Sequence, residues 1–232
     1  MASCCQRGRM ETSLHKQLKL QYTDDEALTE VVVGDFRIDA IVPDGELVEI
    51  QHASLAALKK KTLRLLETPE HRLRIVKPIL ARKRVVTLTR KGGRVQRSRM
   101  SPKRGVLLDI FDDLVYFTSV FPKPRLTLEI ALVEAEEVRV DRKRPTRRGK
   151  KYKTLDQQLT SVQKRIELKE ASDLLEHLPI ASLPSEFDTA ELSSSIERPR
   201  WYAQKVAYCL HKTGAVTQAG KRGNAFLYKA AG

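Results

Sequence analysis

Hydrophobic positions in the N-terminal third of the chain switch between helical and extended spacing. Leu14, Leu18 and Tyr22 recur at helical spacing after Glu11, which predicts an opening amphipathic helix. Short β-rich segments follow, and we expect strands at 31–33, 36–42 and 47–51. Helical spacing then returns at Leu55, Leu58, Thr62 and Leu65. A largely apolar run from Leu73 to Leu80 is typical of a buried strand. The expected order is therefore αβββαβ.

The middle of the chain predicts a cationic hairpin. Ten Lys and Arg and no acidic residue lie between Arg82 and Arg104, around a Lys91-Gly92-Gly93 turn that joins two expected strands. A helical pattern follows from Leu107 to Phe117, and Leu126–Val133 predicts a further strand. Nine basic residues then oppose the single acid Asp141 between Arg139 and Lys153, which favours a linker.

The C-terminal pattern predicts a compact helix-turn-helix with a hairpin. Asp188 and Glu191 fit a capping box, and Pro199 suits the first turn of the next helix. Gly214 is a plausible helix end, followed by expected strands at 215–217 and 226–228 joined by a loop at 218–224.

The net charge of the chain indicates a class of binding partner. Forty-three Lys and Arg against 29 Asp and Glu leave a net charge of +14, which favours a polyanion such as nucleic acid. No apolar run approaches the ~20 residues that cross a bilayer, and no secretory leader is evident, so we expect a cytoplasmic protein and no membrane partner. Three cysteines without CxxC spacing exclude a disulfide framework and a structural zinc site.

The segment from Val42 to Glu46 predicts the candidate site. A three-residue loop with Gly45 at positive φ pairs Val42 with Glu46. The residue numbers of each facing pair then sum to 88, so Asp39 is expected to face Glu49. A two-residue loop would put these carboxylates on opposite faces. Facing carboxylates repel, and Mg²⁺ or Mn²⁺ would resolve the repulsion and activate water at a phosphodiester. The alternative is a solvated face of an ordinary hairpin.

The spacing Asp39, nine residues, then Glu49-Ile50-Gln51, set in an αβββαβ order, resembles the PD-(D/E)XK nuclease superfamily. The resemblance covers roughly residues 10–80 and implies a restriction-endonuclease-like α/β (α+β) core, here with an extra β-hairpin, in a domain over residues 1–140. It also implies metal binding by Asp39, Glu49 and the Ile50 carbonyl, with Glu11 holding a metal-bound water.

Gln51 departs from the superfamily pattern, which usually has Lys at this position. Gln51 is then expected to orient the attacking water, while Lys59, Lys77 or Arg37 supplies the missing cation. Lys77 is the strongest candidate, since an unpaired ammonium inside an apolar strand is costly. His15 and His52 are interpreted as surface or packed side chains, outside the site.

After the 141–165 linker, residues 166–232 resemble the winged-helix family, whose second helix usually enters the major groove. Seven Lys and Arg and no acid follow Glu197. The expected nucleic-acid contacts are Arg200, Trp201, Gln204, Lys205, Lys212, Lys221 and Arg222.

These patterns predict a Mg²⁺-dependent endonuclease acting on double-stranded or branched DNA. Two other classes stay open, a catalytically inactive DNA-binding regulator and an RNA-binding accessory factor. Divalent-metal binding distinguishes the inactive regulator from the nuclease. Competition between DNA and RNA tests the RNA-binding accessory factor. The sequence allows a homodimer but indicates no interface.

Overall fold

A mixed β-sheet of seven strands organises the molecule. The structure is a computed structural model that describes residues 12–147, 149, 151–179 and 183–231. The strands are β1 (Thr29–Val33), β2 (Phe36–Ile41), β3 (Leu47–Ile50), β4 (Leu73–Leu88), β5 (Val95–Met100), β6 (Leu126–Asp141) and β7 (Tyr152–Leu168). Their order is β1-β2-β3-β4-β6-β7, with β5 paired to β4. Strands β3, β4 and β6 run parallel, and the other neighbouring pairs are antiparallel.

Helices cover both faces of the sheet. The principal ones are α1 (Ser13–Lys19), α2 (Lys59–Leu66), α3 (Phe111–Leu114), α4 (Asp173–Glu176), α5 (Thr189–Ser195) and α6 (Arg200–Thr213), with short 3-10 turns at Glu26–Leu28, Leu55–Leu58 and Leu107–Ile110. Leu14 and Leu18 of α1 pack on Val48, Ile50 and neighbouring apolar residues. Leu65 of α2 packs into the larger core on the other side. The predicted αβββαβ order is therefore confirmed, although α1 ends at Lys19 and Tyr22 lies beyond it.

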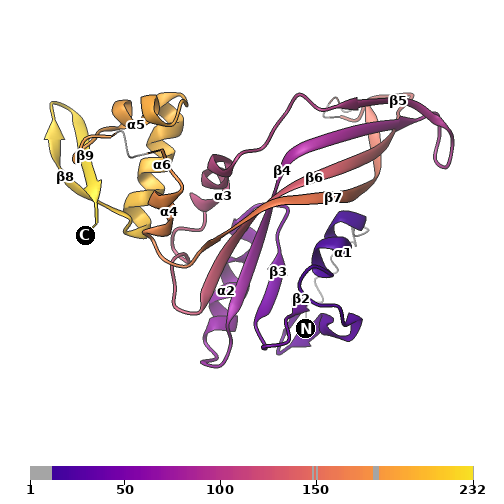
Figure 1. The fold of residues 1–232 in the computed structure, drawn as a ribbon, viewed down its shortest axis with the longest axis horizontal. Helices are drawn as coiled ribbons and strands as arrows, with labels where there is room; N and C mark the ends of the chain where they lie inside the picture. Colours follow the sequence, from indigo (N-terminus) through magenta and orange to yellow (C-terminus); the bar gives the residue numbers. More distant parts are fainter. Residues whose placement is uncertain (1–11, 148, 150, 180–182, 232) are drawn as a thin grey trace.

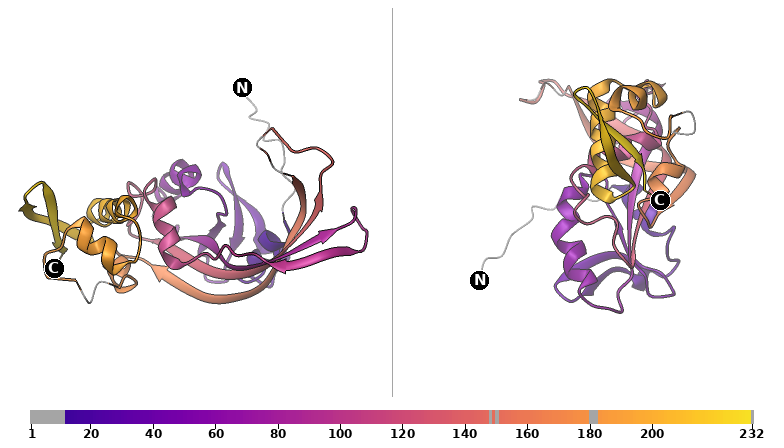
Figure 2. Two further views of the ribbon diagram at one scale, coloured as in Figure 1. Left: turned by 90° about the horizontal axis from the view of Figure 1, so that it is seen from above. Right: turned by 90° about the vertical axis from the view of Figure 1, so that its left-hand side faces the viewer.

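Two ends extend from this core (Figure 1). At one end the long strands β4, β6 and β7 continue past the core and, with β5, form a curved arm, which Figure 2 shows from above. The predicted hairpin around Lys91 is confirmed as the β4–β5 pair. Strand β4 runs on to Leu88, well past the predicted end at Leu80.

The linker predicted at 141–165 is wrong for most of its length. Residues from Tyr152 onward form β7, which pairs with β6 along nearly its whole length, from Asp141–Tyr152 to Leu128–Leu168. The sequence gives little sign of this strand. A basic run precedes it, and its residues from Tyr152 to Arg165 are exposed or only partly buried, so that Ile166 and Leu168 are its only buried residues. Residues Ile166–Leu168 thus belong to the main sheet, and not to the C-terminal module.

The opposite end is a small module formed by α5, α6 and a hairpin of β8 (Val216–Arg222) and β9 (Ala225–Ala230). Asp188 and Glu191 form the predicted capping box, and Gly214 ends α6 with φ 85°. The loop predicted at 218–224 is mostly strand, since Arg222 pairs with Ala225 and the turn is reduced to Gly223 and Asn224. We call residues 187–231 the C-terminal module.

This module packs directly on the sheet domain. Val206 and Leu210 of α6 belong to the same apolar core cluster as Phe111 and Leu114 of α3. The hydroxyl of Tyr202 donates a hydrogen bond to the Leu108 carbonyl at 2.5 Å. A shared core of this kind indicates that the two parts fold together. Among the described residues, no helix combines the length and apolar character needed to cross a bilayer.

Candidate functional site

The β2–β3 hairpin sets the geometry of the site. Gly45 has φ 84°, its amide donates to the Val42 carbonyl at 2.8 Å, and the Val42 amide donates to Glu46 at 3.1 Å. Ala40 pairs with Val48 and Ile41 with Leu47, so facing numbers sum to 88 as predicted. The three-residue turn is thus confirmed, and the register continued by one residue would bring Asp39 opposite Glu49, just beyond the last pair that the two strands form.

The backbone ladder ends before Asp39. The Asp39 Oδ2 atom accepts the hydrogen bond from the Ile50 amide, at 2.8 Å, that a backbone carbonyl would accept in a regular sheet. The predicted pairs Ile38–Ile50 and Arg37–Gln51 do not form, because β2 leaves β3 here. The Gln51 amide points to the other neighbour, β4, and donates to the Val76 carbonyl at 2.8 Å. The strands therefore diverge at the carboxylate pair.

Helix α1 supplies two partners for Asp39. His15 Nε2 lies 3.1 Å and Lys19 Nζ 3.4 Å from Asp39 Oδ1. Burial would raise the pKa of Asp39, but the His15 hydrogen bond and charge, the Ile50 amide and the Lys19 charge outweigh it and leave this pKa below its ordinary value. Asp39 is therefore held as a carboxylate. His15, interpreted from the sequence as outside the site, lies in it.

The pKa of Glu49 is shifted in the opposite direction from that of Asp39. Glu49 is 7% exposed, and its carboxylate forms an ion pair with the Lys61 ammonium from α2. Burial raises the pKa of Glu49, Lys61 lowers it, the Asp39 charge raises it again, and the net direction is upward. The two carboxylates thus retain part of their repulsion, even with an ammonium group on each.

Lys61 is the functional candidate that the sequence analysis missed. Its ammonium also donates to the Arg37 carbonyl, so it bridges β2 and β3 across the opening between them. A signal was present, because Leu58, Thr62 and Leu65 mark the buried face of α2 and Lys61 lies beside that face. The run of three lysines at 59–61 concealed which one points inward.

Two other predicted site residues, Lys77 and Gln51, bind backbone carbonyls of the loop after β3. The Lys77 ammonium donates to the carbonyls of His52 and Ala53, at 3.2 and 2.7 Å, and pairs with Asp113 at 2.8 Å. Lys77 therefore anchors the loop after β3. Gln51 directs its amide to the Ser54 carbonyl at 2.8 Å. Glu11 lies outside the described residues.

The donor set fits a hard divalent cation. Asp39 and Glu49 are close enough for the Asp39 charge to raise the pKa of Glu49, and their carboxylates offer oxygen ligands. Mg²⁺ typically takes one or two carboxylates while keeping several waters. Within the described part of the chain, no group of three or more His, Cys, Asp or Glu side chains forms a metal cluster. The fit therefore rests on Asp39 and Glu49, with the Ile50 backbone beside them.

The predicted nucleic-acid contacts divide into two groups. Lys205 pairs with Asp112 of the sheet domain, and Arg222 pairs with Glu191 at 2.9 Å. Lys205 therefore attaches the module to the sheet domain, and Arg222 joins two elements within the module. The remaining five are exposed: Arg200, Trp201, Gln204, Lys212 and Lys221.

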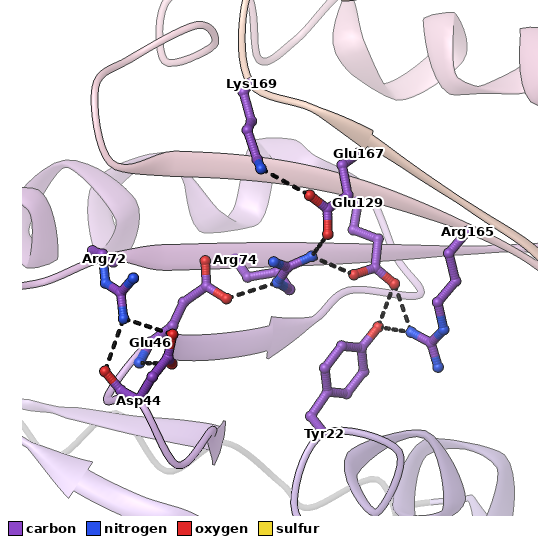
Figure 3. A network of polar contacts seen from close by, with 9 residues as sticks. All are labelled: Tyr22, Asp44, Glu46, Arg72, Arg74, Glu129, Arg165, Glu167 and Lys169. Atoms are coloured by element: carbon purple, nitrogen blue, oxygen red, sulfur yellow. Dashed lines mark hydrogen bonds and ion pairs between the residues drawn. The ribbon is translucent and has the colours of Figure 1, made fainter.

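A second charged cluster lies near the start of β4 and β6 (Figure 3). Glu129 is 2% exposed and accepts hydrogen bonds from Tyr22, Arg74 and Arg165. Arg74 also contacts Glu46 and Glu167. Because positive and negative groups alternate and satisfy one another, this network joins the segment after α1 to the sheet.

The molecule is thus a mixed α/β protein, and its candidate site lies where β2 and β3 diverge. The chain belongs to the family described as Domain of unknown function (DUF8091), which matches residues 12–169 and so contains this site. A protein of Treponema pallidum (strain Nichols), named only as an uncharacterized protein, is 28% identical over 222 residues, covering 94% of this chain and 85% of that protein. No solved structure matches the chain.

Proposed function

We propose that the protein is a metal-dependent phosphodiesterase of the PD-(D/E)XK type that cleaves nucleic acid, with DNA as the expected substrate. The observation that carries the proposal is the closeness of Asp39 and Glu49 where β2 and β3 diverge: the Asp39 charge raises the pKa of Glu49, and Lys61 forms an ion pair with Glu49. The order of elements adds support, since three antiparallel strands are followed by a helix and a parallel strand. In that superfamily the same order frames the active site.

Asp39 and Glu49 would hold Mg²⁺ or Mn²⁺, together with the Ile50 carbonyl. The cation would supply charge neutralisation at the phosphodiester and a more acidic bound water. Lys61 replaces the cation that Gln51 lacks in the Glu-x-Lys pattern, and its ammonium stabilises negative charge beside Glu49. Lys77 and its carbonyl partners position the loop that carries Gln51, whose amide oxygen then orients water.

Two basic surfaces would hold the polyanion. The arm presents exposed cations on β4, β5 and their turn, among them Arg84, Arg94 and Arg99. The C-terminal module resembles a winged helix, with α6 as its second helix and the β8–β9 hairpin as its wing. Contacts of this kind are made mostly to phosphates, so affinity falls steeply with salt.

Binding without cleavage is the second candidate function, and a specific observation favours it. Each carboxylate of the pair already has an ammonium within ion-pair distance, Lys61 on Glu49 and, on Asp39, Lys19, which also pairs with Glu30. A nuclease fold neutralised by its own lysines would bind DNA as a regulator. The two candidates differ in their response to divalent metal.

The test is cleavage of labelled linear, supercoiled and branched DNA, and of RNA, with Mg²⁺ or Mn²⁺. We expect metal-dependent cutting by the wild type that Asp39→Asn and Glu49→Gln both abolish. Asp35→Asn, an exposed carboxylate in the preceding turn, is the matched control and should cut normally. Salt-sensitive binding with no cutting under any of these conditions would reject the nuclease and support the regulator.

A further inference from the structure

A groove separates α6 from the β8–β9 hairpin in the C-terminal module. Its volume is about 240 Å³, and its walls come from both elements. Helix residues at intervals of four, four and three line one wall, which places them on a single face of α6. They are Arg200, Gln204, Tyr208 and His211. The opposite wall carries Asn224, Phe226 and Tyr228.

Aromatic rings dominate this groove without being buried. Tyr208 and Phe226 are each 45% exposed, although the core of the module lies directly beneath α6 and could have covered apolar groups. Exposed aromatic rings on facing walls offer flat surfaces at a spacing set by the fold. Nucleobases stack on such rings because every base presents a π-face.

The charges around the groove select an anionic ligand. Arg200 lines the groove itself, Lys221 Nζ lies 4.9 Å from the Phe226 ring centre, and Lys212 Nζ lies 6.0 Å from that of Tyr208. The acidic residues beside the groove, Asp188 and Glu191, are both paired with Arg222. The amides of Gln204 and Asn224 can each donate and accept, which suits the hydrogen-bonding edge of a base.

We propose that this groove binds an unpaired nucleobase of single-stranded nucleic acid, with the adjoining phosphates at Arg200 and Lys221. A paired base inside a duplex hides both its faces and its pairing edge, so rings and amides recessed in a groove can reach only an unpaired one. This function goes beyond the proposed cleavage, because it depends on no carboxylate and no metal.

The test measures binding by fluorescence anisotropy in EDTA, so that a failure of the metal site cannot affect it. The probes are labelled oligothymidine, oligouridine and a blunt duplex of similar length. Loss of one stacking partner typically weakens single-strand binding about tenfold. We expect that loss for Tyr208→Ala and for Phe226→Ala, with duplex affinity nearly unchanged.

Two controls separate stacking from general damage. Tyr208→Phe keeps the ring and should bind single strands as the wild type does. Tyr116→Ala removes a ring that is 58% exposed outside the groove and should also have no effect. Preference for oligothymidine or oligouridine would identify DNA or RNA as the source of the base. Equal losses for single strand and duplex, or unchanged affinity in both alanine variants, would overturn the proposal.

Discussion

The Asp39 carboxylate accepts a hydrogen bond from the Ile50 backbone amide at 2.8 Å, in the place where the β2–β3 ladder stops. One side chain thus replaces a backbone carbonyl and holds two diverging strands together. The same bond fixes one oxygen of Asp39, leaving the other toward His15 and Lys19. A site built in this way is pre-organised by the sheet and does not depend on a mobile loop.

Lys61 is expected to matter for catalysis more than its neighbours in α2. Lys61→Ala should lower the single-turnover cleavage rate by roughly 100-fold, because a positioned side chain that assists charge or proton transfer typically contributes at least that much. Lys60→Ala, an exposed lysine one position away, is the control and should retain the wild-type rate. Equal rates for both variants would remove Lys61 from the site.

The raised pKa of Glu49 predicts a pH-dependent stability. Burial raises this pKa and Lys61 only partly offsets it, so the folded protein binds a proton at Glu49 more tightly than the unfolded chain does. The contribution is complete below the unfolded-state pKa and is lost as the pH rises through the folded-state pKa. Glu49→Gln does not titrate. Its melting temperature in EDTA should therefore rise relative to the wild type between about pH 4 and about pH 7.

A constant difference across that range, or a difference of the opposite sign, would contradict the assigned direction. Asp35→Asn serves as the control, since Asp35 is exposed and should leave the pH profile unchanged.

Glu129 should be the most sensitive residue of the network in Figure 3. Glu129→Ala leaves Arg74, Arg165 and Tyr22 without their shared acceptor. Breaking a buried ion pair from one side typically costs about 3–5 kcal/mol in the free energy of unfolding. Glu167→Ala removes a carboxylate of the same network that is 42% exposed and should cost far less. Urea unfolding measures both, and comparable losses would show that burial does not decide the effect.

The shared core predicts that the C-terminal module and the sheet domain unfold together. Tyr202 is 6% exposed and bonds to the Leu108 carbonyl across the contact. Tyr202→Phe should lower the stability of the whole molecule by about 1 kcal/mol, the usual contribution of one hydrogen bond. Calorimetry should show a single transition that moves as a unit, whereas exposed Tyr208→Phe should not move it. Two transitions, with the smaller one alone shifted, would indicate independent domains.

Much of the sheet could be predicted from local patterns. The three-residue turn with Gly45 predicts the register that the structure shows for Ile41–Leu47 and Ala40–Val48, because side-chain alternation leaves a strand pair only two faces. The capping box at Asp188 and the left-handed Gly214 likewise marked the helices of the C-terminal module. These signals involve residues a few positions apart.

The rest depended on contacts between distant parts of the chain. Lys61 reaches Glu49 only because α2 folds back over the sheet, and His15 reaches Asp39 because α1 packs on the other side. The sequence predicts a linker where most of strand β7 lies, because few of its residues are buried, and the strand forms through its pairing with β6. Tertiary contacts of this kind leave no periodic signal in one sequence.

Calorimetric titration with Mn²⁺ tests whether Asp39 and Glu49 form a divalent-metal centre, because it needs no cleavage. We expect saturable binding by the wild type at neutral pH that weakens on acidification, as Glu49 takes up a proton, and that disappears in Asp39→Asn and in Glu49→Gln. Wild-type protein that binds no Mn²⁺, or variants that bind it as tightly as the wild type, would contradict the claim.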